Sequence, residues 1–179
     1  MDIAAGMAAS FALLSDGTVY SWGANTYGEL GLGYKSTNQA SPTLIPNLTG
    51  ITDIAAGNIH TLALKSDGTV WEWGSNSFGQ VGGVSYYGDS VPEQIAGLND
   101  IIAIAADGVL SMALDSSGNV YTWGANFSGQ LGDGTTADKR TPTVISSISD
   151  IIAIGTGSQH ALALRDDGTL YTWGYNYTG

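Results

Sequence analysis

The sequence predicts an all-β fold, a β-propeller of four-stranded blades with about 50 residues per blade. A motif of the general form Asp-Gly-Thr-Val-Tyr-x-Trp-Gly-x-Asn occurs four times, and its Trp-Gly pairs begin at residues 22, 73, 123 and 173. The successive spacings are therefore 51, 50 and 50 residues, a fixed period that indicates a repeat architecture. Each repeat holds short apolar runs, Gly-rich turns and no helical period. Four-stranded units repeated around an axis make a propeller.

We interpret the whole chain, residues 1–179, as a single propeller segment. Its repeats cover approximately residues 2–52, 53–102 and 103–152, and a partial fourth repeat covers 153–179. A linear β-solenoid is the alternative, but solenoid repeats are usually shorter, so the propeller is favoured. The fourth copy of the motif reaches Gly179 before the Leu-Gly or Val-Gly seen in the other copies. We expect that further repeats in a longer chain, or a second copy forming a homodimer, complete the ring.

Each repeat is predicted to begin with a short inner strand of small and apolar residues, at 3–6, 54–57, 104–107 and 154–157. A second strand follows at 11–14, 62–65, 112–115 and 162–165. An Asp-Gly or Ser-Gly pair then makes a tight hairpin turn, because glycine adopts positive φ without strain. We interpret the acids Asp16, Asp67, Asp166 and Asp167 as turn-capping residues rather than as calcium ligands or a catalytic pair.

The third strand is the Val-Tyr-x-Trp-Gly segment. Alternation places Val19 and Ser21 on one face of this strand, and Tyr20 and Trp22 on the other. A tryptophan at this position in all four repeats indicates packing between blades, where it buries a large apolar area. We therefore assign a structural role to the blade motif, which consists of Trp22, Trp73, Trp123, Trp173, Gly23, Gly74, Gly124 and Gly174.

A turn rich in Asn and Gly follows the third strand, with Leu or Val as its apolar plug. A polar, variable loop comes next, at residues 32–40, 83–90 and 133–140, and the outer strand is expected around 43–45, 93–95 and 143–145. A proline precedes each outer strand, which suits an edge position. Variable loops held by a rigid scaffold are the usual place for specificity. The candidate interaction residues in these loops are Tyr34, Lys35, Tyr86, Tyr87, Lys139 and Arg140.

The composition excludes several function classes. The chain carries 16 acidic and 5 basic residues, a net charge of −11, which repels phosphate backbones, so we expect no nucleic-acid partner. No apolar run approaches the roughly 20 residues of a membrane span, so we expect no membrane insertion. There is no cysteine and hence no disulfide framework or thiolate metal site. Few Lys and Arg residues together with much Asn, Ser, Thr and Gly favour a bacterial secreted or cell-surface protein.

No catalytic constellation is found. His60 and His160 occupy the same repeat position, but Ala9 and Leu110 replace them in the other two repeats. We interpret each histidine as a structural residue that bonds a turn inside its own blade. Asp107 stands where the other repeats have glycine, and we attribute it to repeat variation. The glycine-rich strings lack the Lys-Ser or Lys-Thr of a phosphate loop. We predict no catalytic residue, no cofactor and no metal.

The combined pattern of Gly-x-x-His, Ala-Leu, Asp-Gly-x-Val-Tyr-x-Trp-Gly-x-Asn-x-x-Gly-Gln-Leu-Gly and Pro resembles the regulator-of-chromosome-condensation (RCC1-like) repeat, over all 179 residues. The resemblance implies a seven-bladed propeller. From the residues themselves, we expect a non-enzymatic protein-interaction scaffold, or a structural repeat segment, whose protein partner is unidentified. The resemblance implies two alternatives, a guanine-nucleotide exchange factor for a small GTPase and a binding propeller like the hydrolase inhibitors of some bacterial relatives.

Overall fold

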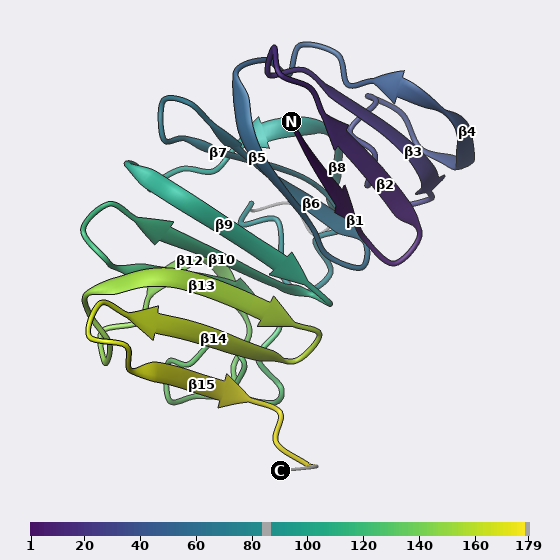
Figure 1. Ribbon diagram of the computed structural model, residues 1–179. Coiled ribbons are helices and arrows are strands. Elements are labelled where there is room, and N and C mark those ends of the chain that lie inside the picture. The colour runs from purple at the N-terminus through teal and green to yellow at the C-terminus, as the bar shows by residue number, and fades with distance from the viewer. Residues whose placement is uncertain (84–86, 178–179) are drawn as a thin grey trace.

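In a computed structural model, the chain folds into four antiparallel β-sheets that follow one another in sequence order, and residues 1–83 and 87–177 are described. Figure 1 shows the sheets side by side from the N-terminus to the C-terminus, each as one blade. The described residues contain strands and turns but no helix. The predicted all-β propeller architecture is confirmed.

Each blade is a meander in which consecutive strands pair. Blade 1 consists of β1 (Asp2–Ala5), β2 (Ala9–Leu13), β3 (Val19–Asn25) and β4 (Ser36–Leu44). Blade 2 consists of β5 (Ile51–Ala56), β6 (His60–Lys65), β7 (Val70–Gly74) and β8 (Asp89–Gln94). Blade 3 consists of β9 (Ile101–Asp107), β10 (Leu110–Asp115), β11 (Val120–Gly124) and β12 (Lys139–Val144). The described strands of blade 4 are β13 (Ile151–Gly157), β14 (His160–Arg165) and β15 (Leu170–Gly174).

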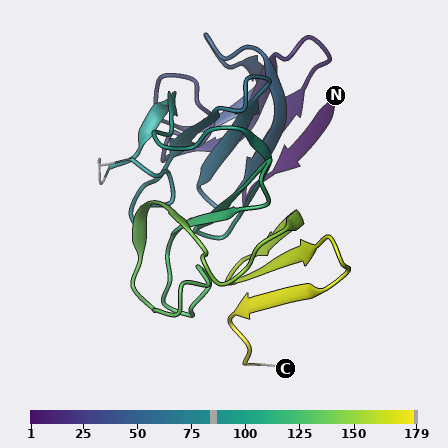
Figure 2. The ribbon, with the colours of Figure 1, turned by 90° about the vertical axis from the view of Figure 1, so that its left-hand side faces the viewer.

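The first strand of each blade is the inner one. β1 contacts β5, β5 contacts β9 and β9 contacts β13, so the inner strands form a continuous row. Figure 2 shows from another side how the blades follow one another from the N-terminus to the C-terminus. Hairpin turns add bonds between blades, because the carbonyl of the turn glycine accepts from the first residue of the next inner strand. The donor and acceptor pairs are Ile51 with Gly17, Ile101 with Gly68 and Ile151 with Gly118.

The strand boundaries differ from the expected ones in two ways. The inner strands of blades 2 to 4 begin three residues earlier than expected, because Ile51 and its counterparts are buried and already paired. The outer strands begin before the prolines and not after them, so β4 takes over about half of its expected loop and β8 and β12 each take over the last two residues of theirs. Pro92, for example, lies inside β8. The β7–β8 register shifts between the Glu72–Glu93 and Gly74–Asp89 pairs, and this bulge accommodates the proline on an edge strand.

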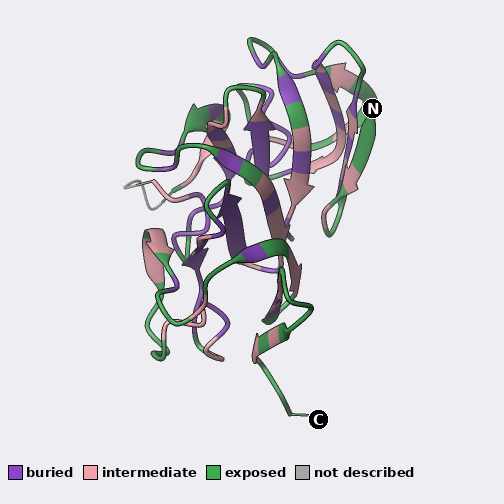
Figure 3. Ribbon diagram, turned by 60° about the vertical axis from the view of Figure 1, so that its left-hand side comes forward, coloured by how far each residue is buried: buried purple, intermediate pink, exposed green. Residues whose placement is uncertain are grey.

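The hydrophobic core lies between blades rather than inside any one of them. Three buried clusters each join two neighbouring blades, as when Phe11 and Leu13 of blade 1 pack with Ile54 and Trp73 of blade 2. Figure 3 shows the buried residues concentrated on the strands in the middle of the arc. Each blade therefore depends on its neighbours for burial of its apolar faces.

The outward sides of blades 1 and 4 are open in consequence. Ile3 is 81% exposed, although its counterpart Ile54 in blade 2 is 4% exposed. Leu170 in blade 4 is 59% exposed, although its counterpart Val70 in blade 2 is fully buried. These two sides present the same apolar positions that the interior blades bury, so they are the places where further blades would pack.

Candidate functional site

The two ends of the strands have different chemistry. We define the loop end as the end that carries the segments between third and fourth strands, namely residues 26–35, 77–83, 87–88 and 127–138, together with 175–177 after β15. The turn end carries the Asp-Gly hairpins at the opposite ends of the same strands. Thr18 donates to the Asp16 carboxylate from both its N–H and its hydroxyl, and Thr69 does the same with Asp67. These acids therefore cap their own turns.

An asparagine organises each segment of the loop end. In blade 2, Asn76 Oδ1 accepts from Val81 N at 3.2 Å and Asn76 Nδ2 donates to Gly83 O at 2.9 Å. Asn25 makes the equivalent bonds to Leu30 and Tyr34 in blade 1. The buried asparagine thus holds both ends of the turn, while the first residues of the turn, such as Tyr27 and Phe78, are exposed.

Exposed aromatic side chains gather at the loop end. Every aromatic side chain that is exposed within residues 1–83 and 87–177 lies there, and we call this set the aromatic rim: Tyr27, Tyr34, Phe78, Tyr87, Phe127, Tyr175 and Tyr177. The Phe78 and Phe127 rings meet edge to face with centroids 6.4 Å apart, and Tyr175 stacks on Tyr177 at 6.2 Å. At Phe78 and Phe127 the rim therefore crosses the boundary between blades 2 and 3.

The predicted loop residues of blades 1 and 2 contact one another. Lys35 Nζ donates to the backbone carbonyl of Tyr87 at 3.3 Å and so joins the two loops. Tyr34 is 47% exposed and lies 3.5 Å from Gln39 through its hydroxyl, while Tyr87 is 88% exposed. Tyr86 lies outside the described residues. Lys35 thus orders the surface on which Tyr34 and Tyr87 project.

The basic pair of blade 3 does not lie in a loop, contrary to expectation. Lys139 and Arg140 are the first residues of β12, because the outer strand begins earlier than predicted. Lys139 Nζ forms an ion pair with Asp133 at 3.2 Å. Arg140 Nη2 donates to the backbone carbonyl of Asn76 at 3.1 Å and thereby attaches β12 to the turn of blade 2. Lys139 and Arg140 therefore stabilise turns of the loop end through their contacts with Asp133 and Asn76.

The blade motif lies at the blade interfaces. Trp73 and Trp123 are fully buried, whereas Trp22 and Trp173 are half-buried beside the more open blades. Trp73 Nε1 donates to the carbonyl of Glu29 in the preceding blade at 2.8 Å, and Trp173 Nε1 donates to that of Gln130 at 2.9 Å. The glycines after the tryptophans have φ between 101° and 109°, and a Cβ there would collide with the backbone of the preceding hairpin; they are Gly23, Gly74, Gly124 and Gly174.

The histidines bond differently from the expectation. His60 is 1% exposed, and its Nε2 lies 2.9 Å from the Ser111 hydroxyl of the next blade, not from a turn of its own blade. Ser111 donates its proton to Gln80 O, so Nε2 carries the imidazole proton. Burial lowers the pKa of His60 to about 4. His160 is exposed on the open side of blade 4. His60 is therefore a neutral residue that links blades 2 and 3.

His60 is expected to make the protein sensitive to acid. Its pKa in the fold lies below the unfolded value of 6.5, so the unfolded chain takes up the proton first and stability is lost as pH falls from 6.5 toward 4. Relative to His60→Leu, which copies Leu110 of blade 3, wild type should lose about 2 kcal/mol between pH 7 and pH 5. Urea midpoints of both proteins at the two pH values measure this. An unchanged difference between them would refute the assignment.

The described residues offer little for metal or cofactor chemistry. No group of three or more His, Cys, Asp and Glu side chains among them is arranged to hold a metal ion. The Asp107 carboxylate accepts a hydrogen bond from Gly108 N. Asp107 also lines a polar depression at one end of the inner strands, together with Met7 and Asn58. No helix long and apolar enough for a bilayer occurs in the described part of the chain.

Sequence reasoning named only Tyr34 and Tyr87 of the aromatic rim, and it missed one buried acid. Tyr27, Phe78 and Phe127 belong to the turn motif itself, and their aromatic character in three successive repeats was the available signal. Glu72 was missed as well, although it occupies a position that is Ser21 and Thr122 in the neighbouring blades. It is 6% exposed, and burial together with the nearby Glu93 raises its pKa to about 9.

Comparison with known proteins decides the family. A family model of the RCC1-like domain matches residues 1–179, which is the whole chain. The chain belongs to the RCC1-like domain family. Two solved structures are similar to the chain over nearly its whole length. Human WBSCR16 is 26% identical with a TM-score of 0.86 over 98% of this chain. Prp20p from Saccharomyces cerevisiae, described with its binding properties to Gsp1p and histones, is 25% identical with a TM-score of 0.84 over 99% of this chain.

Curated relatives of this RCC1-like chain are much longer proteins. The probable E3 ubiquitin-protein ligase HERC6 of Homo sapiens is 46% identical over 87 residues, which are 48% of this chain and 8% of HERC6. The probable E3 ubiquitin-protein ligase HERC4 of Rattus norvegicus is 43% identical over 84 residues, also 8% of its length. The chain spans 48% of the WBSCR16 structure and 45% of the Prp20p structure.

Proposed function

We propose that this RCC1-like chain is a non-enzymatic protein-interaction scaffold whose partner binds the loop end. The aromatic rim is the observation that carries the proposal. Tyr, Phe and Met are enriched at protein interfaces, where a few large side chains supply most of the binding energy. The rim presents seven such rings on one end of the strands, and the turn end presents none among the described residues.

The contacts beneath the rim favour a preformed binding surface. Lys35 joins the loops of blades 1 and 2, and Arg140 joins blades 2 and 3. Buried asparagines fix each turn from inside. A surface that is ordered before binding loses less conformational entropy in the complex. The partner can therefore meet aromatic side chains that already project in their bound positions.

The test uses a variant that removes three rings of the rim without touching the core. Tyr27→Ser, Phe78→Ser and Phe127→Ser are combined, and the immobilised chain is exposed to an extract from its native source. A partner identified by mass spectrometry is then purified and titrated against both proteins. We expect the triple variant to bind at least 10-fold more weakly, a loss of about 1.4 kcal/mol or more.

The matched control changes the opposite end of the strands. Asp16→Asn and Asp67→Asn keep the Asx-type acceptor at the exposed hairpin turns, so the double variant should bind the partner like wild type. Equal binding by wild type and the rim variant, or selective loss in the turn-end variant, would overturn the proposal.

Guanine-nucleotide exchange on a small GTPase is a second proposal, favoured by the similarity to Prp20p across nearly the whole chain. Release of a fluorescent nucleotide from purified GTPases measures it directly. Acceleration by wild type that is lost in the rim variant would assign exchange activity to the loop end. No acceleration with any GTPase of the native source would reject it.

A further inference from the structure

One position in the third strand carries a hydroxyl side chain in blades 1 and 3 but a carboxyl side chain in blade 2. Ser21 donates its hydroxyl proton to Leu30 O at 2.8 Å, and Thr122 donates to Leu131 O at 2.7 Å. These bonds fasten the turn of the loop end to the strand. Blade 2 has Glu72 instead, whose carboxyl group is buried and whose Oε2 has no hydrogen-bond partner. A buried carboxyl without a partner is costly, so its presence calls for a compensating group.

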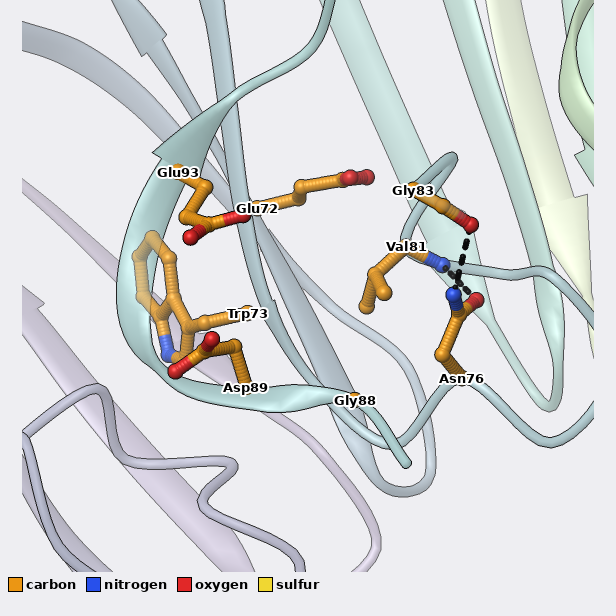
Figure 4. Close-up of a pocket in the computed structure, with 8 residues that line it drawn as sticks. All are labelled: Glu72, Trp73, Asn76, Val81, Gly83, Gly88, Asp89 and Glu93. Atoms are coloured by element: carbon orange, nitrogen blue, oxygen red, sulfur yellow. Dashed lines mark hydrogen bonds between the residues drawn. The ribbon is translucent and has the colours of Figure 1, made fainter. Parts of the chain in front are cut away.

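The Glu72 carboxyl lies at a cavity of about 90 Å³ between β7, β8 and the turn after β7. Figure 4 shows Glu72 extending toward Gly83 and Val81, with Glu93 and Asp89 on the β8 side of the cavity. Glu93 is the direct cross-strand partner of Glu72. Apolar walls come from Trp73 and Val81. The lining thus places the buried Glu72 carboxyl beside apolar side chains, with the Glu93 and Asp89 carboxyls on the opposite side.

Among the described residues that line this cavity there is no cationic side chain. Glu93 of β8 is the charged group beside Glu72, whereas Asp89 lies farther along β8 and accepts a hydrogen bond from Val91 N. On β6, the titratable residue on the same face as Glu72 is His60, which is neutral. Blade 3 contributes Trp123, whose Nε1 is also buried without a partner and, like Glu72 Oε2, lies next to the place that a Cβ on Gly82 would take. Burial and Glu93 therefore keep Glu72 protonated at neutral pH unless a cation enters.

We propose that this cavity binds a primary alkylammonium group, as carried by a lysine side chain of a protein partner. An ammonium has three N–H donors, and on the side toward which Glu72 extends the lining offers the Glu72 carboxylate and the Gly83 carbonyl oxygen as acceptors. Its methylene groups pack against Trp73 and Val81. A metal ion fits less well, because the described side chains do not form a group of three or more metal ligands. The assignment of the ammonium group to a lysine of a protein partner rests on the proposed function, whereas the ammonium site itself does not.

The first experiment titrates the 179-residue chain with n-butylammonium chloride and follows the indole N–H signals of Trp73 and Trp123 by NMR. We expect saturable binding in the ~mM range, as suits a ligand of five heavy atoms. Affinity should increase up to about tenfold from pH 7 to pH 8, because binding displaces the Glu72 proton. Glu72→Gln should weaken binding at least tenfold and remove the pH dependence. Asp107→Asn, remote from the cavity, is the matched control.

Two lysine derivatives test whether a lysine side chain can supply the ammonium group, and divalent cations test whether the site binds a metal ion instead. Nα-acetyl-lysine methylamide should bind like butylammonium, and its Nε-acetylated form should not, because it lacks the charge. Equal butylammonium binding by wild type and Glu72→Gln, or none by wild type, would overturn the proposal. A Glu72-dependent increase in melting temperature with Ca²⁺ or Mg²⁺ alone would overturn it in favour of a metal site. These titrations need no protein partner, so they fail independently of the rim experiment.

Discussion

Replacing Glu72 with glutamine is expected to stabilise the free protein by about 3 kcal/mol at pH 7. The pKa of Glu72 in the fold is about 9, above the unfolded value of 4.5. The stability associated with the protonated carboxyl is therefore fully present below pH 4.5 and is lost as pH rises toward 9. Glutamine is neutral at every pH and does not incur this loss. For a chain of 179 residues, the expected increase in melting temperature is roughly 6–12 °C.

Thermal unfolding of wild type and Glu72→Gln between pH 5 and pH 9 measures this effect. The difference in melting temperature should be small at pH 5 and grow steadily with pH. Glu72→Thr is a useful companion, because it restores the hydroxyl that Thr122 uses in blade 3. A difference that stays constant from pH 5 to pH 9 would show that Glu72 is already ionised in the fold. If Glu72→Gln both stabilises the protein and removes ammonium binding, then the wild-type residue sacrifices stability for ligand binding, which is common at functional sites.

Truncation of Trp73 to alanine is expected to destabilise the protein by about 3–5 kcal/mol. The side chain is fully buried between blades 1 and 2, its ring meets Phe11 edge to face at 6.4 Å, and its Nε1 donates to Glu29 O. Alanine loses all three contacts and leaves a cavity at the interface. Chemical denaturation followed by far-UV circular dichroism, in place of tryptophan fluorescence, gives the free energy of unfolding.

Trp22→Ala is the matched control for this prediction. It has the same place in its blade, but it is half-buried on the open side of blade 1, so it should cost less than half as much. Trp73→Phe separates packing from hydrogen bonding. Thr61 continues to donate to Glu29 O in that variant, so we expect a loss of only about 1–2 kcal/mol. Equal losses for Trp22→Ala and Trp73→Ala would contradict the conclusion that burial between blades decides the cost.

The fold could be predicted almost entirely from the repeat. The Trp-Gly spacing and the Asp-Gly turns determine four similar units, and a third strand that alternates Val19, Tyr20 and Ser21 leaves few alternatives to a meander. The outer strands were harder to predict because their prolines suggested a boundary. Pro92 instead lies inside β8, where a bulge removes the need for its missing N–H.

The candidate sites could be predicted only in part. Tyr34, Lys35 and Tyr87 do lie at the loop end, but Lys35 and Arg140 are engaged by backbone carbonyls of neighbouring blades. Single-repeat reasoning does not show such bonds, since each joins residues more than fifty positions apart. The same limitation hid the bond from His60 to Ser111, which crosses from blade 2 to blade 3.

The sequence by itself determined the repeat length, the strand order and the positions that are apolar in every blade, because these depend on local turns and on period-two alternation. Only the tertiary structure decided which faces are buried, since a blade buries its apolar positions against its neighbours. The Ile and the Val or Leu positions that are buried in blade 2 are therefore exposed at Ile3 in blade 1 and at Leu170 in blade 4. It also decided that Glu72 lies in a cavity with Asp89 and Glu93. Glu72 of β7 and Glu93 of β8 are direct neighbours there because these two strands pair antiparallel in this register.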